Sequence, residues 1–558
     1  MNTKTRRILL IVPILGVLLL GGGYVGYRAY KSARQARLIT QARNYLAKPE
    51  ERKALLCLQR ALRYNAKDVE ACRLMAELTE RARSPGALIW RSRVVELNSH
   101  SLDDRLALAQ TAMLFRDYAS ATNALEGVDA AGKMTPAYHN IAGAVASTVG
   151  QLAQAEVHFR EAARLEPTNQ VPQLNLAIVR LHSTNAQVMA EARASLQQLS
   201  AKPEFRCQAL RELIVDALNS TRTDAALALS ADLLNQSNAV FSDRLLRLEI
   251  LRASKNPALG KTLAAFQKDA ASDPAKIQQL ATWQLLKTGP ADALAWLETL
   301  PPSIRTNQPV ALLSAECRTQ LKDWRALQAA LEHQNWAELD FVRHAFLARA
   351  ARGLDLTSTS KTEWELAAKA AISRKQSVLM LLQMAAQWHW QGESEELLWT
   401  IFNRYPEEKW AVPALSQALY SGGRTRSLMT LYSQLAKAYP SELSTKNNLA
   451  MTALLLDAQE LKPRDLALEV YQKAPTNSSY ASTYAFSLHL QKKDAEALKV
   501  MQMLSSKALE DPSIAGYYGL ILKATGNPDK AKVYLQWASK AKLLPEEKKL
   551  FDSAKTGA

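Results

Sequence analysis

Small and bulky side chains recur along this chain at a spacing of 34 residues, and this period constrains the fold more than any other feature. Counting from Pro136 as position 1, Gly143 falls at position 8, Ala155 at 20, Phe159 at 24 and Pro167 at 32. The same register begins at Asp68, Leu102, Pro136 and Gln170, and again at Lys409, Leu443, Ser478 and Pro512. A period of this length predicts one supersecondary unit that is repeated and stacked.

Each column of the repeat has a physical role in a pair of packed helices. A small residue at position 20 allows two helices to cross closely, and a bulky residue at 24 fills the space between pairs. Glycine at position 15 suits a turn with positive φ, and proline at position 32 ends a helix. The residues are Ala87, Ala121, Ala155, Ala497 and Ala531 at 20; Leu125, Phe159, Tyr432, Met501 and Leu535 at 24; Gly150, Gly423 and Gly526 at 15; Pro167 and Pro440 at 32.

This pattern resembles the tetratricopeptide repeat (TPR), a helix–turn–helix unit. The resemblance implies an all-α fold, a TPR-type α-solenoid in which each helix pair shelters its apolar face against its neighbours. It covers residues 68–545, an array of roughly fourteen repeats, with 546–558 as a C-terminal cap or tail. Units 102, 136, 409 and 512 are clear, whereas 204–408 is degenerate and retains only proline and glycine between apolar segments with helical periodicity.

The N-terminus predicts one transmembrane helix. After a short basic stretch, residues 1–7, residues 8–27 contain no charge and have the length that crosses a bilayer core. Tyr24, Tyr27, Arg28 and Lys31 are the side chains expected at the membrane interface, since aromatic and basic residues favour that zone. Residues 28–67 follow as a basic juxtamembrane helical segment with a partial first repeat.

Two features of this segment have alternatives. Residues 8–20 could be the apolar core of a cleaved signal peptide, although four basic residues just downstream argue against export of a mature chain. Gly22 and Gly26 form a small-xxx-small pair that could support a homodimer through the anchor. Basic residues flank both ends, so the side of the membrane that carries the repeats stays open.

The positive charge is concentrated next to this segment. Residues 1–49 contain nine Lys/Arg and no Asp/Glu, so they hold 9 of the formal net charge of +17. Such a cluster suits anionic lipid headgroups, or serves only to fix topology. Because the remaining chain is nearly balanced, the charge does not indicate nucleic acid as a partner.

The sequence contains no motif for catalysis, a cofactor or a metal. No two of the eight histidines are spaced three or four residues apart, and no His/Cys cluster or G-x-S-x-G motif occurs. We therefore predict no cofactor and no enzyme activity. The alternative is an enzyme site hidden in 204–408, where carboxylates or histidines from different repeats could converge.

The resemblance also implies a concave groove, because positions 2, 5, 9, 12 and 13 of TPR units face it. In this chain those positions are neutral and partly apolar, which suits a protein or peptide partner. The alternative is that the curvature of the array covers much of this face. The candidate groove residues are Leu106, Gln110, Asn140, Asn447, Met451 and Phe486.

Trp388 and Trp390 are candidate exposed anchors for a partner. Two residues apart on a helix, they would point to nearly opposite sides, so at least one should be exposed. Exposed tryptophan is typical of binding hot spots.

Together these features predict a membrane-anchored scaffold for protein–protein interactions, in a bacterial inner membrane as a single-pass protein. Envelope assembly, secretion and polysaccharide export are roles that TPR arrays fill. The alternatives are a secreted or periplasmic soluble binding protein after signal cleavage, and the hidden enzyme.

Overall fold

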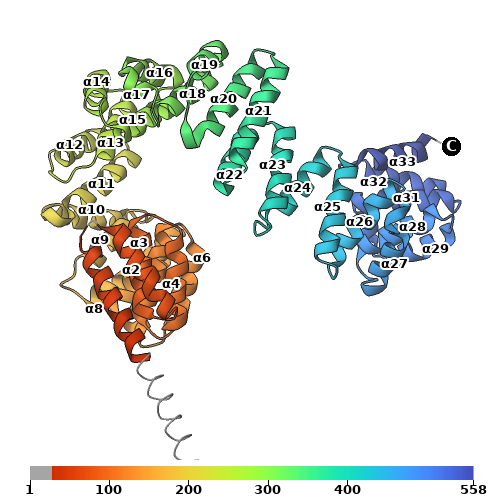
Figure 1. Ribbon diagram of the computed structural model, residues 1–558, viewed down its shortest axis with the longest axis horizontal. Helices are drawn as coiled ribbons and strands as arrows, with labels where there is room; N and C mark the ends of the chain where they lie inside the picture. The colour runs from red at the N-terminus through yellow and green to blue at the C-terminus, as the bar shows by residue number, and fades with distance from the viewer. Residues whose placement is uncertain (1–27, 49, 557–558) are drawn as a thin grey trace, which may run out of the picture. The chain divides into compact units, whose positions relative to one another are not determined.

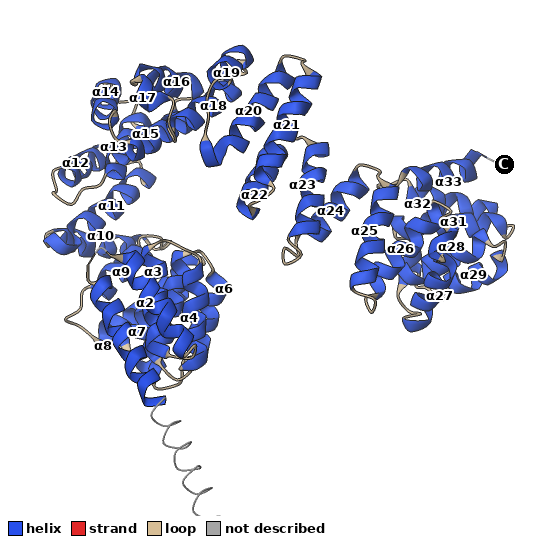
Figure 2. Ribbon diagram, in the orientation of Figure 1, coloured by secondary structure: helices blue, strands red, loops and turns tan. Residues whose placement is uncertain are grey.

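The computed structural model describes residues 28–48 and 50–556, and every regular element in those ranges is a helix (Figure 2). The predicted all-α class is therefore confirmed for this part of the chain. The helices form two compact units, one ending at Ala270 and the other beginning at Ala271.

Unit 1 consists of antiparallel helix pairs that follow one another along the chain (Figure 1). In each pair we call the N-terminal member the first helix and the other the second helix. A helix over residues 28–46 packs with α2, and six further pairs run from α3/α4 to α13/α14. The helices are α2 (Glu51–Tyr64), α3 (Val69–Arg81), α4 (Gly86–Leu97), α5 (Leu102–Leu114), α6 (Tyr118–Glu126), α7 (Pro136–Thr148), α8 (Leu152–Leu165), α9 (Val171–Arg180), α10 (Ala186–Ser200), α11 (Pro203–Asn219), α12 (Thr223–Leu234), α13 (Phe241–Ala253) and α14 (Leu259–Ala270).

Unit 2 repeats the arrangement with eight pairs, which include residues 271–408 of the region in which the sequence pattern is degenerate. The pairs are α15 (Pro274–Lys287) with α16 (Pro290–Thr299), α18 (Val310–Leu321) with α19 (Trp324–Leu331), α20 (Asp340–Gly353) with α21 (Thr357–Ala371), α22 (Lys375–Gln387) with α23 (Gln391–Arg404), α24 (Ala411–Ser421) with α25 (Thr425–Ala438), α26 (Leu443–Leu455) with α27 (Pro463–Lys473), α28 (Ser478–Leu490) with α29 (Asp494–Gln502), and α31 (Pro512–Ala524) with α32 (Pro528–Ala538). Short helices α17 (Pro302–Arg305) and α30 (Ser506–Leu509) lie between pairs, and α33 (Pro545–Thr556) is the last helix.

The repeat columns mark where the two helices of a pair touch. A Cβ added to Gly143 would lie 2.7 Å from a ring carbon of Phe159, so only glycine at position 8 admits the bulky residue at 24. In the last pair, a Cβ on Gly519 would lie 2.8 Å from Leu535 and 3.1 Å from a backbone oxygen. Ala155 and Phe159 are 0% and 2% exposed, which confirms that these columns form the core.

Position 15 is the turn between the first and second helices. Gly150, Gly423 and Gly526 have φ values of 80°, 66° and 82°, which confirms the predicted use of glycine there. In other pairs a non-glycine residue takes the same left-handed conformation, as His389 does with φ 59°. From Lys322 to Gly526 the left-handed residue that ends each first helix recurs at intervals of 33 to 35 residues.

Buried ion pairs join the first helices of consecutive pairs in unit 1. Arg73 of α3 donates to both carboxylate oxygens of Asp104 in α5, at 2.7 and 2.6 Å. Arg211 of α11 reaches Asp243 in α13 in the same way, at 2.7 and 2.9 Å. Both carboxylates are nearly inaccessible, so these contacts fix how one pair stacks on the next.

Candidate partner-binding surfaces

The predicted groove residues of unit 1 differ in accessibility. Leu106 is buried in the core of α5, α6 and α7, because α7 packs directly on α5 and covers that face. It therefore offers no surface to a partner. Gln110 is exposed, and Asn140 is half-buried, accepting a hydrogen bond from the Asn175 amide at 3.2 Å. Gln110 and Asn140 stay predictions.

The predicted groove residues of unit 2 lie beneath another part of the chain. Asn447 and Phe486 are 6% and 2% exposed, and Met451 is half-buried. Phe486 shares an apolar cluster with Phe551 of α33, and Met451 packs against the same cluster. The expectation that these residues are open to a partner is corrected: Asn447 is buried, and the C-terminal helix packs on Phe486 and Met451.

Trp388 and Trp390 do not project to opposite sides. The helical argument fails because α22 ends at Gln387, and the left-handed His389 turns the chain between the two rings. Their ring centroids lie 5.1 Å apart in an edge-to-face contact. Trp390 is buried and Trp388 half-buried, so neither is the freely exposed anchor that was predicted.

Both rings instead surround a cation. The Arg349 guanidinium lies 5.4, 5.7 and 5.6 Å from the ring centroids of Trp324, Trp388 and Trp390, and Arg352 lies 3.6 Å above Trp390. Burial and the neighbouring Arg352 lower the pKa of Arg349, whose Nε–H is buried without a hydrogen-bond partner. The aromatic faces thus stabilise a positive charge within the helical array.

An apolar pocket of about 220 Å³ opens beside these rings, across the first helices α18, α20 and α22. Its lining is almost entirely apolar and includes the flexible side chains of two methionines. The lining residues are Leu312, Leu313, Glu316, Val342, Phe346, Met380, Met384, Gln387 and Trp388. Of these, only Trp388 was singled out from sequence. The recurring left-handed residues Lys322, Asp355 and His389 would have given the missing register, but φ cannot be read from those residue types.

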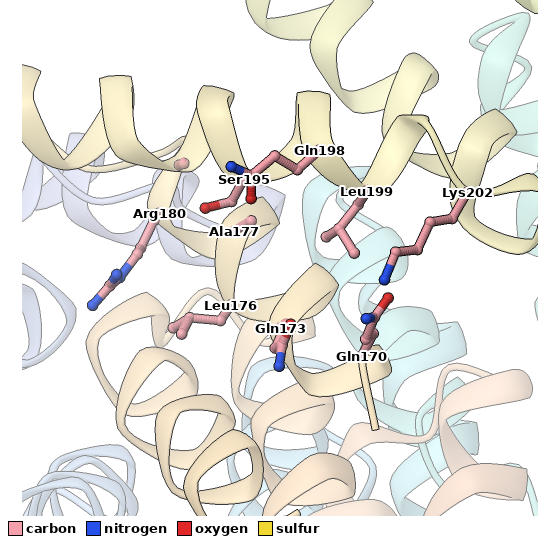
Figure 3. Close-up of a pocket in the computed structure, with 10 residues that line it drawn as sticks. Gln170, Gln173, Leu176, Ala177, Arg180, Ser195, Gln198, Leu199 and Lys202 are labelled. Carbon is pink, nitrogen blue, oxygen red and sulfur yellow. The ribbon is translucent and has the colours of Figure 1, made fainter. Parts of the chain in front are cut away.

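A second, polar cleft of about 380 Å³ lies between α9 and α10 of unit 1 (Figure 3). Gln170, Gln173, Gln198, Ser195, Arg180 and Lys202 supply its polar groups. Arg180 is held by Glu156 at 3.0 Å. The lining contains no carboxylate, histidine or thiol, so this cleft has no group suited to general acid–base catalysis near neutral pH.

Acidic and histidine side chains do converge once in the degenerate region. His344 contacts Glu363 at 2.6 Å and Asp340 at 3.3 Å, and Asp340 also pairs with Arg343 at 2.6 Å. None of these side chains lines either pocket described above. Among residues 28–48 and 50–556, no group of three or more His, Cys, Asp or Glu is placed to hold a metal ion.

In unit 1, His139 of α7 and His158 of α8 face each other, with their Nδ1 atoms 3.0 Å apart. Burial lowers the pKa of both imidazoles, and their mutual repulsion lowers that of His158 further. One neutral ring can donate to the other, but two protonated rings cannot.

This pair predicts a loss of stability on acidification. Because both folded pKa values lie below the ordinary value of 6.5, the unfolded chain binds protons first as the pH falls. The stabilising contribution is therefore present above pH 6.5 and is lost as the pH falls through that value towards the folded pKa values. Urea unfolding of unit 1 between pH 7.5 and 5.5 should show this slope, and His139→Asn/His158→Asn should flatten it. An equal slope in the double variant would contradict the assignment.

The predicted membrane segment, residues 8–27, lies outside the described residues, as do Tyr24, Tyr27, Gly22 and Gly26. No helix within residues 28–48 and 50–556 combines the length and apolar character needed to span a bilayer. Arg28 is exposed at the start of the 28–46 helix, whereas Lys31 is half-buried.

Comparisons with known proteins give no family assignment. No protein-family model matches the chain, and no curated protein matches it. Among solved structures, a chain of the APC/C hetero-tetramer Cut9–Hcn1 matches at 11% identity with a TM-score of 0.28, covering 93% of this chain and 96% of that one. A chain of Naa15/Naa10 bound to HypK-THB matches at 12% identity with a TM-score of 0.30, covering 94% and 78%. Because both TM-scores are below 0.5, neither match carries weight for fold or function.

Proposed function

We propose that this protein is a non-catalytic scaffold that binds protein partners through the first helices of its repeats. The observation that carries this proposal is the apolar pocket across α18, α20 and α22. A continuous apolar pocket with a polar rim is typical of a surface that receives side chains of another protein.

The chemistry of the pocket indicates what it receives. Met380, Met384 and Trp388 give an adaptable wall, and a volume of about 220 Å³ suits one or two large apolar side chains. Arg349 contacts the Trp388 ring through its guanidinium. Among the described residues, no carboxylate forms an ion pair with Arg349. A partner segment with a leucine or aromatic anchor followed by an acidic residue fits both features.

The membrane attachment is part of the same proposal. We infer that residues 8–27 anchor the chain in a bacterial inner membrane. Support comes from Arg28, Arg34 and Arg37, which are exposed along the 28–46 helix that directly follows. Basic side chains at this place suit an anionic lipid surface.

In cells producing the full chain, a photoactivatable benzophenone side chain at position 384 is expected to crosslink a discrete partner. The adduct should remain in the membrane pellet after a carbonate wash, because the anchor resists extraction. Leu313→Glu should reduce its yield about tenfold or more, since a carboxylate in the pocket must be desolvated on binding. Mass spectrometry should map the crosslink to an apolar partner segment.

The matched controls use exposed positions of unit 2. The benzophenone at Met503, which is 75% exposed, should give no discrete adduct, and Leu286→Glu, at a residue 73% exposed, should leave the position-384 adduct unchanged. The binding surface would be refuted if positions 384 and 503 gave equal crosslinking yields, or if Leu313→Glu left the yield at position 384 unchanged. Release of the whole chain by carbonate would refute the anchor separately.

A further inference from the structure

The C-terminal helix α33 lies on the inner face of the unit 2 helices that precede it. It packs on α31 and α32 (Figure 1). Its apolar side chains join a cluster formed by α26, α28 and α31, the first helices of three successive pairs, together with the end of α32. The face that a partner would use is thus occupied by a segment of the same chain.

Phe551 is the main anchor of α33. It is 1% exposed, and its ring meets Tyr517 edge to face at 5.2 Å. The site is shaped for it, because a Cβ on Gly516 would lie 2.4 Å from the Phe551 ring. Phe486 completes the aromatic wall at 4.8 Å from Tyr517.

A buried carboxylate fixes the register of α33. Glu547 is 8% exposed and accepts hydrogen bonds from the Tyr517 hydroxyl at 2.5 Å and from the Leu544 backbone N–H at 2.8 Å. Burial raises the pKa of Glu547, although the hydrogen bonds from these two donors act to lower it. The spacing from Leu544 to Glu547 to Phe551 places all three on one side of the segment.

The start of α33 and the stretch before it are held by residues more than 100 positions earlier in the chain. The Tyr420 hydroxyl donates to the Lys542 carbonyl at 2.7 Å, and the Thr425 hydroxyl donates to Glu546. Leu544 is buried among leucines of α24 and α25. These contacts are the kind that a separate peptide could make equally well.

The occupied face still contains two unpaired polar atoms. Asn447 Oδ1 and Ser482 Oγ are buried, and neither has a hydrogen-bond partner among the residues that the structure describes. They lie one helical turn before Met451 and Phe486, and so on the same face of α26 and α28. A buried acceptor without a donor is unfavourable, so a ligand that brought a donor to this face would gain affinity over α33.

We propose that the inner face of α26, α28 and α31 is a binding site for an amphipathic helix of a partner protein, and that α33 occupies it as an intramolecular ligand. The partner helix presents the same leucine, acidic and aromatic spacing and adds a hydrogen-bond donor towards Asn447. This surface is distinct from the pocket of α18, α20 and α22 and does not depend on it.

The test uses the full chain and a fluorescein-labelled peptide of residues 539–558, followed by fluorescence anisotropy. Phe551→Ala in the full chain should release α33 and raise the affinity for the peptide about tenfold or more, because the competing helix has lost its anchor. Tyr420→Phe should leave the peptide affinity within about twofold of the wild-type value, because α33 and the peptide lose the same hydrogen bond at Lys542. Asn447→Leu should likewise leave the peptide affinity within about twofold of the wild-type value, since it removes the unpaired acceptor for α33 and for the peptide alike.

Ser553→Ala, at an exposed residue of α33, is the matched control and should bind as the wild-type chain does. A peptide with Phe551→Ala should bind none of the chains. Hydrogen exchange of residues 545–556 should quicken in the Phe551→Ala chain while α26, α28 and α31 stay protected. If those helices lose protection as well, or if all chains bind the peptide equally, α33 is a structural cap and the proposal fails. If the Tyr420→Phe chain formed a concentration-dependent dimer, the ligand of this face would be α33 of a second copy and the proposed partner protein would be wrong.

Discussion

The Phe159→Ala substitution is expected to lower the free energy of unfolding of the α7/α8 pair by about 3–5 kcal/mol. Phe159 is 2% exposed and lies against Gly143 of the facing helix, so its removal leaves a cavity that the two helices cannot close. The size of the effect follows from the repeat itself, because a bulky residue at position 24 fills the space between the helices of the well-marked pairs.

The contact with Gly143 makes this prediction sharper. In the wild-type chain, Gly143→Ala should cost about 1–3 kcal/mol, since the new Cβ would lie 2.7 Å from the Phe159 ring. In the Phe159→Ala background the same change should be neutral or stabilising by up to about 1 kcal/mol, because alanine favours a helix over glycine. The sign of Gly143→Ala should therefore depend on the residue at position 159.

Hydrogen exchange of residues 136–165 is the appropriate measurement, because repeat arrays open locally rather than in one step. Val157→Ala, at a residue of α8 that is 60% exposed, is the control and should change protection little. If Gly143→Ala costs the same in both backgrounds, the two side chains are not in the close contact described.

Asp243→Ala should destabilise the junction of α11 and α13 by about 3–5 kcal/mol. Asp243 is 2% exposed and accepts two hydrogen bonds from Arg211 and one from the Val240 backbone N–H at 2.8 Å. Its removal leaves the Arg211 guanidinium without its anion and the first turn of α13 without its cap.

A matched ion pair provides the comparison. Arg206 and Asp232 join α11 to α12 at 2.9 Å, but both side chains are more than a third exposed. Asp232→Ala should therefore cost less than about 1 kcal/mol. Urea unfolding and hydrogen exchange of residues 203–253 would separate the two variants. Similar losses for both would mean that burial does not govern the strength of these pairs.

The sequence predicted those features of the fold that depend on contacts within one helix pair. Ala155, Phe159 and Gly150 carry their signal within a 34-residue window, because a close crossing needs a small residue and a left-handed turn favours glycine. The ion pairs between Arg73 and Asp104 and between Arg211 and Asp243 left no signal, since arginine and aspartate are also common on solvated surfaces.

The candidate sites were predicted less well than the helices. The prediction for Trp388 and Trp390 assumes that both lie on one helix, whereas the chain turns at His389 between them and brings the two rings together. The pocket of α18, α20 and α22 combines side chains from three pairs whose register the degenerate sequence does not reveal. Asn447, Met451 and Phe486 were predicted as groove residues, but Asn447 is buried and α33 packs in the same apolar cluster as the other two.

By itself, therefore, the sequence determined that the described chain is built from paired helices and where each well-marked pair turns, because both depend on residues close together along the chain. The tertiary structure alone decided which faces of those pairs remain accessible. Accessibility depends on contacts such as that between Tyr420 and Lys542, 122 residues apart, and local spacing carries no information about such contacts.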